Sequence, residues 1–175
     1  MKKIVFFCAF TLLSFISVKA QSYGIKGGVN FANLSGSDAD GFDGLTGFHV
    51  GAIAEFKIFD NLALQPELVY SAQGAKLQDV DYKLGYLTLP VMAKFYLNDK
   101  LSVHAGPQFG LLVSDADGVD GTDNNTTDFG ISGGIEYRLV GGLFIQGRYN
   151  SGLSKISDNA EVKNTVLQFS IGYLF

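Results

Sequence analysis

The sequence predicts an all-β protein, an eight-stranded antiparallel up-and-down transmembrane β-barrel that follows a cleaved signal peptide. Eight segments alternate apolar residues with polar or small ones, as strands with two different faces do. Very short and long polar connections alternate between these segments, as at the two ends of a membrane barrel. Charged residues within the segments fall opposite the apolar residues, which places them inside the closed barrel.

The first twenty residues have the pattern of a secretory signal peptide. Two lysines follow the initial methionine, residues 4–18 are almost wholly apolar, and Val18 and Ala20 are small residues suited to a cleavage site after Ala20. The apolar run is shorter than the roughly 20 residues that a transmembrane helix needs. We therefore expect a signal peptide over residues 1–20 and an outer-membrane β-barrel domain over residues 21–175.

The eight segments follow this predicted signal peptide in sequence order. We expect strands near residues 22–34, 46–59, 62–74, 83–97, 101–113, 128–140, 143–153 and 164–175. The short connections are rich in residues that tolerate tight turns: Asp60-Asn61, Asn98-Asp99-Lys100 and Gly141-Gly142. The long connections are residues 35–45, 75–82, 114–127 and 154–163. In a membrane barrel the short turns face the periplasm and the long loops face outward.

Eight charged residues share the face opposite the apolar side chains of their strands. They are Lys26, Glu55, Lys57, Glu67, Lys94, Glu136, Arg138 and Arg148. One charge on the lipid face at mid-membrane costs about 2–4 kcal/mol, so this placement favours a barrel in lipid. An eight-stranded barrel is just wide enough for side chains to fill. We therefore expect these eight residues to form a structural network of ion pairs and hydrogen bonds in the lumen, and a narrow solute channel is the less favoured alternative.

The last strand alternates strictly to the final residue. Phe169, Ile171, Tyr173 and Phe175 lie on one face, and Gln168 and its alternating neighbours lie on the other. This terminal pattern resembles the membrane insertion signal of bacterial outer-membrane barrels. The sequence thus predicts insertion by the barrel insertion machinery into outer-membrane lipid.

Beyond the alternation of residue types, several segments have distinctive residue sequences. They are Gly24-Ile25-Lys26-Gly27-Gly28-Val29-Asn30, Leu64-Gln65-Pro66-Glu67-Leu68-Val69-Tyr70-Ser71-Ala72-Gln73-Gly74, Tyr86-Leu87-Thr88-Leu89-Pro90, Ala105-Gly106-Pro107-Gln108 and Gly147-Arg148-Tyr149-Asn150-Ser151-Gly152-Leu153. In this order they closely resemble the PorT-like outer-membrane β-barrel protein family, over nearly the whole chain after residue 20. The resemblance implies an eight-stranded barrel in the cell outer membrane. It implies little chemistry.

Charge narrows the choice of partner. Three of the thirteen basic residues and none of the seventeen acidic ones precede residue 21, which leaves a net charge of −7 for residues 21–175. This argues against nucleic acid as a partner. The acidic residues concentrate in the four long connections, so we expect acidic loops on the outer surface.

An enzyme is the second class of function that the residues allow. Ser102 and His104 share one face of a strand, and His49 is the other histidine. A lipid A hydrolase would need such a hydroxyl and imidazole. Both point inward near the short-turn end, whereas lipid A lies in the outer leaflet, so interior histidines with structural partners are the favoured interpretation and no catalytic residue is expected.

Calcium binding by residues 115–125 is a third candidate. The acidic residues there miss the twelve-residue calcium-loop register, because Val119 stands at a ligand position and Thr126 at the closing position. The favoured interpretation is a solvated acidic loop. We expect no cofactor and no metal centre.

The three prolines, Pro66, Pro90 and Pro107, all fall within predicted strands. Each removes a backbone donor from the sheet. We expect a local bulge or a gap in the hydrogen-bond ladder there, which serves in docking or insertion.

The sequence therefore predicts a monomeric outer-membrane barrel with a structural or interaction role. Loops on a rigid scaffold usually carry binding, so we expect an extracellular or envelope protein partner for the acidic loops. An accessory role in protein secretion across the outer membrane is the alternative that family analogy suggests.

Overall fold

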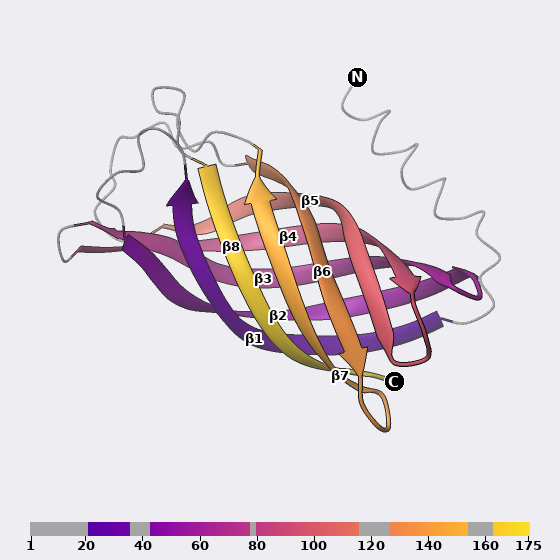
Figure 1. Ribbon diagram of the computed structural model, residues 1–175. Helices are drawn as coiled ribbons and strands as arrows, with labels where there is room; N and C mark the ends of the chain where they lie inside the picture. Colours follow the sequence, from indigo (N-terminus) through magenta and orange to yellow (C-terminus); the bar gives the residue numbers. More distant parts are fainter. Residues whose placement is uncertain (1–20, 36–42, 78–79, 116–126, 154–162) are drawn as a thin grey trace, which may run out of the picture.

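The computed structural model describes residues 21–35, 43–77, 80–115, 127–153 and 163–175, which form one closed barrel (Figure 1). The strands are β1 (Gln21–Ser35), β2 (Asp43–Phe59), β3 (Leu62–Leu77), β4 (Val80–Tyr96), β5 (Leu101–Asp115), β6 (Thr127–Arg138), β7 (Leu143–Gly152) and β8 (Lys163–Leu174). Each strand is antiparallel to both neighbours. The predicted fold class is confirmed, and every strand boundary lies within three residues of its predicted position.

The sheet closes where the first strand meets the last. β1 pairs with β8 in one unbroken register from Gly24↔Leu174 to Ser35↔Lys163. Closure leaves no unpaired sheet edge, which a barrel in lipid requires because nothing there can satisfy free backbone groups.

The short turns lie at the same end as the C-terminus (Figure 1). In the β4–β5 turn, Asn98 Oδ1 accepts hydrogen bonds of 2.9 Å from the backbone N–H groups of Lys100 and Leu101. In the β6–β7 turn, Gly141 and Gly142 have φ angles of 70° and 88°. Side chains with a Cβ rarely adopt these angles, so the glycine pair fits this turn.

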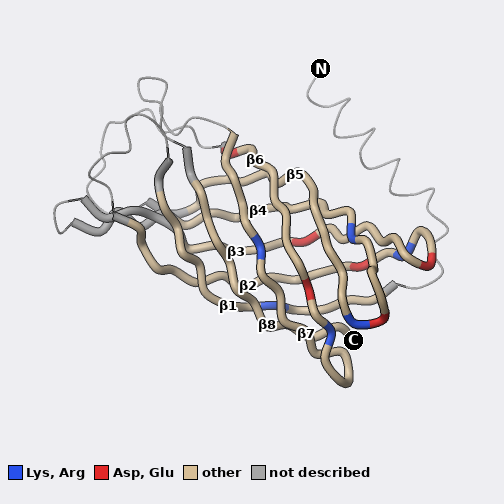
Figure 2. Tube along the Cα trace, viewed as in Figure 1, with Lys and Arg blue, Asp and Glu red and all other residues tan. Residues whose placement is uncertain are grey.

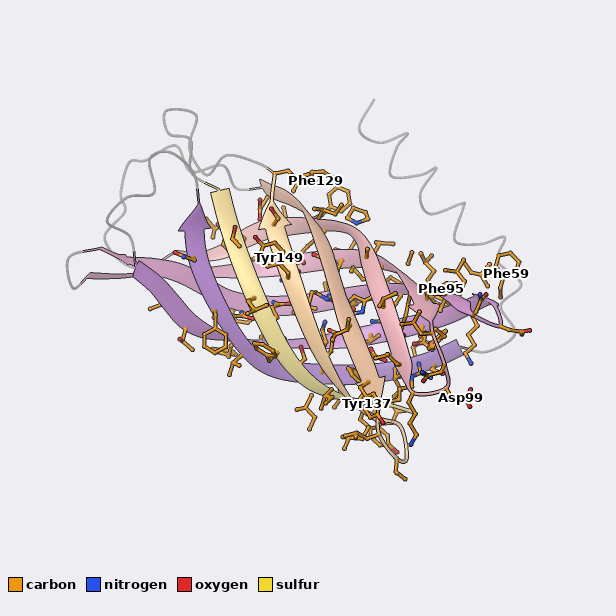
Figure 3. All side chains as sticks on the ribbon, viewed as in Figure 1. Phe59, Phe95, Asp99, Phe129, Tyr137 and Tyr149 are labelled. Atoms are coloured by element: carbon orange, nitrogen blue, oxygen red, sulfur yellow. The ribbon has the colours of Figure 1, made fainter. Side chains whose placement is uncertain are left out.

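Side chains alternate strictly between the lumen and the outer wall. In β7, Phe144 and Arg148 are buried, whereas Ile145 is 47% and Tyr149 is 53% exposed. Aromatic side chains project from the wall toward both ends, as Phe129 and Tyr137 show in Figure 3. The barrel therefore has its apolar surface outside and its polar core inside, the reverse of a protein that folds in water.

The prolines interrupt the sheet in one region of the wall. Pairing between β3 and β4 stops at Pro66 and resumes at Val69, and pairing between β4 and β5 stops at Pro90 and resumes at Ala93, without a change of register. Pairing between β5 and β6 continues past Pro107. The predicted ladder gap is present across β3, β4 and β5, because a proline has no N–H to donate.

Some predictions concern parts of the chain outside the described residues. These parts are the signal peptide at residues 1–20 and most of the acidic connections, at residues 36–42, 78–79, 116–126 and 154–162. Within the described part of the chain, no helix is long and apolar enough to cross a membrane.

Candidate functional site

Most of the predicted lumen charges are buried in the barrel interior. Figure 2 shows charged residues at intervals along the strands. Those that expose 2% or less of their surface are Lys26, Glu55, Glu67, Lys94, Glu136 and Arg148. Lys57 differs because it is exposed, and the Arg138 side chain is 25% exposed. Both lie within two residues of a strand end beside a short turn. The charged interior therefore ends at the short-turn mouth.

One group of charges surrounds Lys94, and we call Glu55, Lys94, Glu136 and Arg138 the Lys94 cluster. Lys94 Nζ lies 2.9 Å from Glu55 Oε2 and 2.5 Å from Glu136 Oε1. Arg138 Nη2 lies 2.7 Å from Glu55 Oε2 and donates a 2.8 Å hydrogen bond to Tyr96 Oη. Both carboxylates thus contact at least one buried cation.

A second group surrounds Glu67, and we call Lys26, Glu67 and Arg148 the Glu67 cluster. Arg148 donates to both carboxylate oxygens of Glu67, at 2.8 Å from Nη1 and 2.6 Å from Nη2. Lys26 Nζ lies 2.7 Å from Glu67 Oε2. This two-pronged arginine geometry is the strongest form of ion pair that side chains make.

Two glutamines join the clusters into one network. Gln65 Nε2 donates to Glu67 Oε1 at 2.7 Å, and Gln65 Oε1 accepts from Lys94 Nζ at 3.0 Å. Gln146 connects the same two clusters through hydrogen bonds of 3.1 Å and 3.3 Å. Polar side chains thus span the lumen continuously at this level. A buried charge that loses its partner costs several kcal/mol, so each member depends on the others.

A neutral network occupies the long-loop half of the lumen beside β1, β2 and β8. Asn30 Oδ1 lies 2.7 Å from His49 Nδ1 and accepts a 3.1 Å hydrogen bond from Gln168. His49 Nε2 lies 2.7 Å from Ser170 Oγ. The two ring nitrogens of His49 are therefore both engaged in structural contacts.

The geometry does not assemble the residues that a hydrolase would use. Ser102 and His104 are 1% and 4% exposed, inside the lumen. Within the described residues, Ser102 Oγ and His104 Nδ1 have no hydrogen-bond partner, while His104 Nε2 lies 3.2 Å from Arg148 Nε. The hydroxyl is not activated by an imidazole, and neither group reaches the outer wall.

A cleft of about 310 Å³ opens at the short-turn mouth, among Lys57, Tyr96, Arg138 and the neighbouring turn residues. Lys57 Nζ and Lys94 Nζ each lie 5.5 Å from the centre of the Tyr96 ring, and Arg138 Cζ lies 5.0 Å from it. The ring face attracts Lys57 and Arg138 at the rim and the buried Lys94 beneath them.

No site for a metal built on three or more His, Cys, Asp or Glu side chains occurs among the residues that the structure describes. Residues 116–125 of the candidate calcium loop lie outside them.

With the fold and the inward charges described, the chain can be compared with known families. The sequence profile of the outer membrane protein beta-barrel domain family matches residues 19–158. The chain belongs to this family. Its apolar outer wall and polar interior are those of a barrel in the outer membrane. No curated protein matches the chain in sequence.

Solved structures share this fold with the chain. Neisserial surface protein A (NspA) has a TM-score of 0.61 at 16% identity, covering 90% of this chain and 100% of that one. Ail, the attachment invasion locus protein of Yersinia pestis, solved with the heparin analogue sucrose octasulfate, has a TM-score of 0.56 at 16% identity, covering 89% and 99%. OprG from Pseudomonas aeruginosa has a TM-score of 0.51 at 11% identity, covering 90% and 97%. Identities this low show a common fold.

The sequence reasoning missed several inward polar residues of this outer-membrane barrel, among them Gln65 and Gln146 of the charged network and two residues of the long-loop half. Asp128 lies in β6 and is separated from Glu136 by an even number of positions, and Asn150 stands in the same relation to Arg148 in β7. The comparison that placed the charged residues opposite the apolar side chains of their strands could have placed Asp128 and Asn150 there as well. It considered neither neutral polar residues nor a carboxylate at a strand end.

Proposed function

We propose that this barrel is a scaffold with a structural or interaction role, whose acidic loops bind an extracellular or envelope protein. The observation that carries the proposal is the filled lumen. The Glu67 cluster, the Lys94 cluster and their two bridging glutamines occupy the interior with paired side chains. A solute path or a catalytic centre would need interior groups that are free to move or to react. We therefore assign the binding function to the loops.

The loops also favour a class of partner. Residues 116–126, for example, include three aspartates and no basic residue. Ail was solved with a heparin analogue, a polyanion. The acidic loops of this chain would repel a polyanion, so we infer a partner with a positively charged surface, bound more weakly at high salt.

The resemblance to the PorT-like family supports a finer placement within the outer-membrane barrels. The same resemblance suggests the second candidate, an accessory role in secretion. Among the described residues, no contact in the lumen or wall favours the secretion role over the loop scaffold. The experiment below distinguishes these two functions.

The test is a deletion strain complemented with the whole chain or with a barrel whose connections 36–42, 116–126 and 154–162 are replaced by short turns. We expect the trimmed barrel to insert normally. Unlike the whole chain, it should not restore the surface properties that the deletion changes. Solute uptake should be the same in all strains, and a change on deletion would favour a channel. Full rescue by the trimmed barrel would overturn the proposal, and a loss of exported proteins that the trimmed barrel restores would favour secretion.

A further inference from the structure

A small cavity lies in the long-loop half of the lumen, where β5, β6 and β7 meet. Gly130 of β6 lines it, paired with Gln108 on one side and Gly152 on the other. A Cβ at Gly130 would lie 2.7 Å from the Ser151 carbonyl oxygen, so this glycine lets β6 and β7 approach closely. The cavity between the surrounding side chains has a volume of about 10 Å³. This is room for one species the size of a water molecule or smaller.

Asn150 lines this cavity with an amide that has no partner. The residue is 4% exposed, and within the described chain neither its Nδ2 nor its Oδ1 forms a hydrogen bond. Buried amides in proteins are almost always bonded. Asn30, the asparagine of the neutral network, uses both its Nδ2 and its Oδ1. The unpartnered amide of Asn150 therefore indicates a ligand in the cavity.

The remaining polar side chains around the cavity supply oxygen atoms. Asp128 contributes a carboxylate, Gln108 an amide oxygen and Ser132 a hydroxyl, which donates a 3.2 Å hydrogen bond to Gln108 Oε1. The backbone of Phe129 hydrogen-bonds to Asp128. The described residues include no Lys or Arg paired with this carboxylate. The cavity thus combines oxygen ligands with one carboxylate that no described Lys or Arg neutralises.

We propose that this cavity binds one calcium ion through Asp128, Asn150, Gln108 and Ser132. Calcium takes carboxylate, amide and water oxygens in flexible geometry, whereas magnesium demands a near-ideal octahedron and keeps its waters. The cavity offers no thiol or imidazole for a softer metal. An anion would meet the Asp128 carboxylate, and a water alone could bond the Asn150 amide but would not neutralise that carboxylate. The cation would tie together three strands that end at the outer connections.

With one carboxylate among its ligands, the site should bind in the range of about 10⁻⁴–10⁻³ M that extracellular calcium modules show. The site itself does not depend on what the loops bind.

The experiment uses the whole protein purified from outer membranes, ¹⁵N-labelled, reconstituted in lipid nanodiscs and freed of metal with a chelator. Calcium chloride is added while the side-chain amide signals of Asn150 and the melting temperature are followed. We expect the Asn150 signals to shift with saturation in the range given above and the melting temperature to rise. Magnesium or sodium chloride at matched ionic strength should produce neither change.

Two variants and one control decide the assignment. Asp128→Asn should weaken the calcium response at least tenfold, and Asn150→Leu, which keeps the branched shape of the side chain, removes its oxygen and breaks no hydrogen bond, should abolish the melting response. Asp120→Asn, in the acidic connection, should leave the Asn150 response unchanged. Asn150 signals that do not move with calcium, or that move equally with magnesium, would overturn the proposal. So would a response lost in Asp120→Asn and kept in Asp128→Asn, because the loop would then be the binding site.

Discussion

The two halves of the lumen hold their polar groups in different ways. In the short-turn half, the seven charged side chains of the Glu67 and Lys94 clusters pair with one another, with Gln65 and Gln146 between them. Only single atoms of Ser102, His104 and Arg138 lack a hydrogen-bond partner there among the described residues. In the long-loop half beside β5, β6 and β7, a cavity is present, and within the described chain both polar atoms of the Asn150 amide lack a partner. The first arrangement fixes the barrel, and the second leaves room for something to bind.

The difference has a physical cause. Ion pairs buried in a narrow lumen stabilise the fold only when every charge is paired, so this half tolerates little change. Small neutral side chains carry no such requirement, and an unfilled position near the mouth is compatible with folding. The same barrel can therefore be rigid at one end and adaptable at the other.

The largest expected effect comes from removing the central anion of the Glu67 cluster. Glu67→Gln leaves Lys26 and Arg148 buried without a counter-charge, which should lower the free energy of unfolding by about 3–5 kcal/mol. Urea unfolding in lipid vesicles measures this loss. The double variant Glu67→Gln with Arg148→Met should recover part of it, because one unpaired charge is removed. An unchanged stability in the single variant would show that water reaches this level of the lumen.

The next effect tests whether the wall separates lipid from the polar core. Val50 is 55% exposed on the outer face, whereas its neighbour His49 is 2% exposed in the lumen. Val50→Lys should cost about 2–4 kcal/mol if this position lies near the middle of the membrane. Val50→Ala keeps the wall apolar and serves as the control. Equal unfolding midpoints for the two variants would place residue 50 outside the hydrocarbon.

A smaller effect is expected at the short-turn mouth, where the charged half meets water. Arg138→Ala removes the contacts to Glu55 and Tyr96, but Lys94 still pairs with Glu55. The loss should be about 1.5 kcal/mol, the lower end for hydrogen bonds to charged groups, because the side chain is partly exposed. Lys57→Ala, at the exposed position beside it, should change stability by no more than the error of the measurement. A loss as large as that of Glu67→Gln would place Arg138 within the sealed interior.

The fold was predictable because a barrel strand has two faces and each follows from parity alone. Phe144, Ile145 and Gln146 alternate between the lumen and the wall, as their sequence pattern indicates. The short turns were predictable from their own residues in the same way, and Gly141-Gly142 adopts the positive φ angles that glycine favours.

The partners within the lumen were not predictable in the same way. Glu67 and Arg148 are 81 positions apart in the sequence and meet only because the sheet closes and tilts. Parity placed both in the lumen without showing which charge each would contact. The cavity was not predictable for a related reason, because its lining residues come from β5, β6, β7 and β8 and meet only in the folded sheet.

The smallest effect provides the sharpest contrast, because two buried asparagines should respond differently to the same change. Asn30→Leu removes hydrogen bonds to His49, Ser71 and the Phe48 carbonyl, and the loss of the bond to the buried His49 ring alone should cost about 1–3 kcal/mol. In calcium-free buffer, Asn150→Leu breaks no hydrogen bond and removes two buried polar atoms that lack partners, so stability should stay the same or rise by up to about 1 kcal/mol. Unfolding of both variants under identical conditions measures the difference. If Asn150→Leu is as damaging as Asn30→Leu, the amide has a partner in the folded protein even without calcium, and the two halves of the lumen are equally saturated.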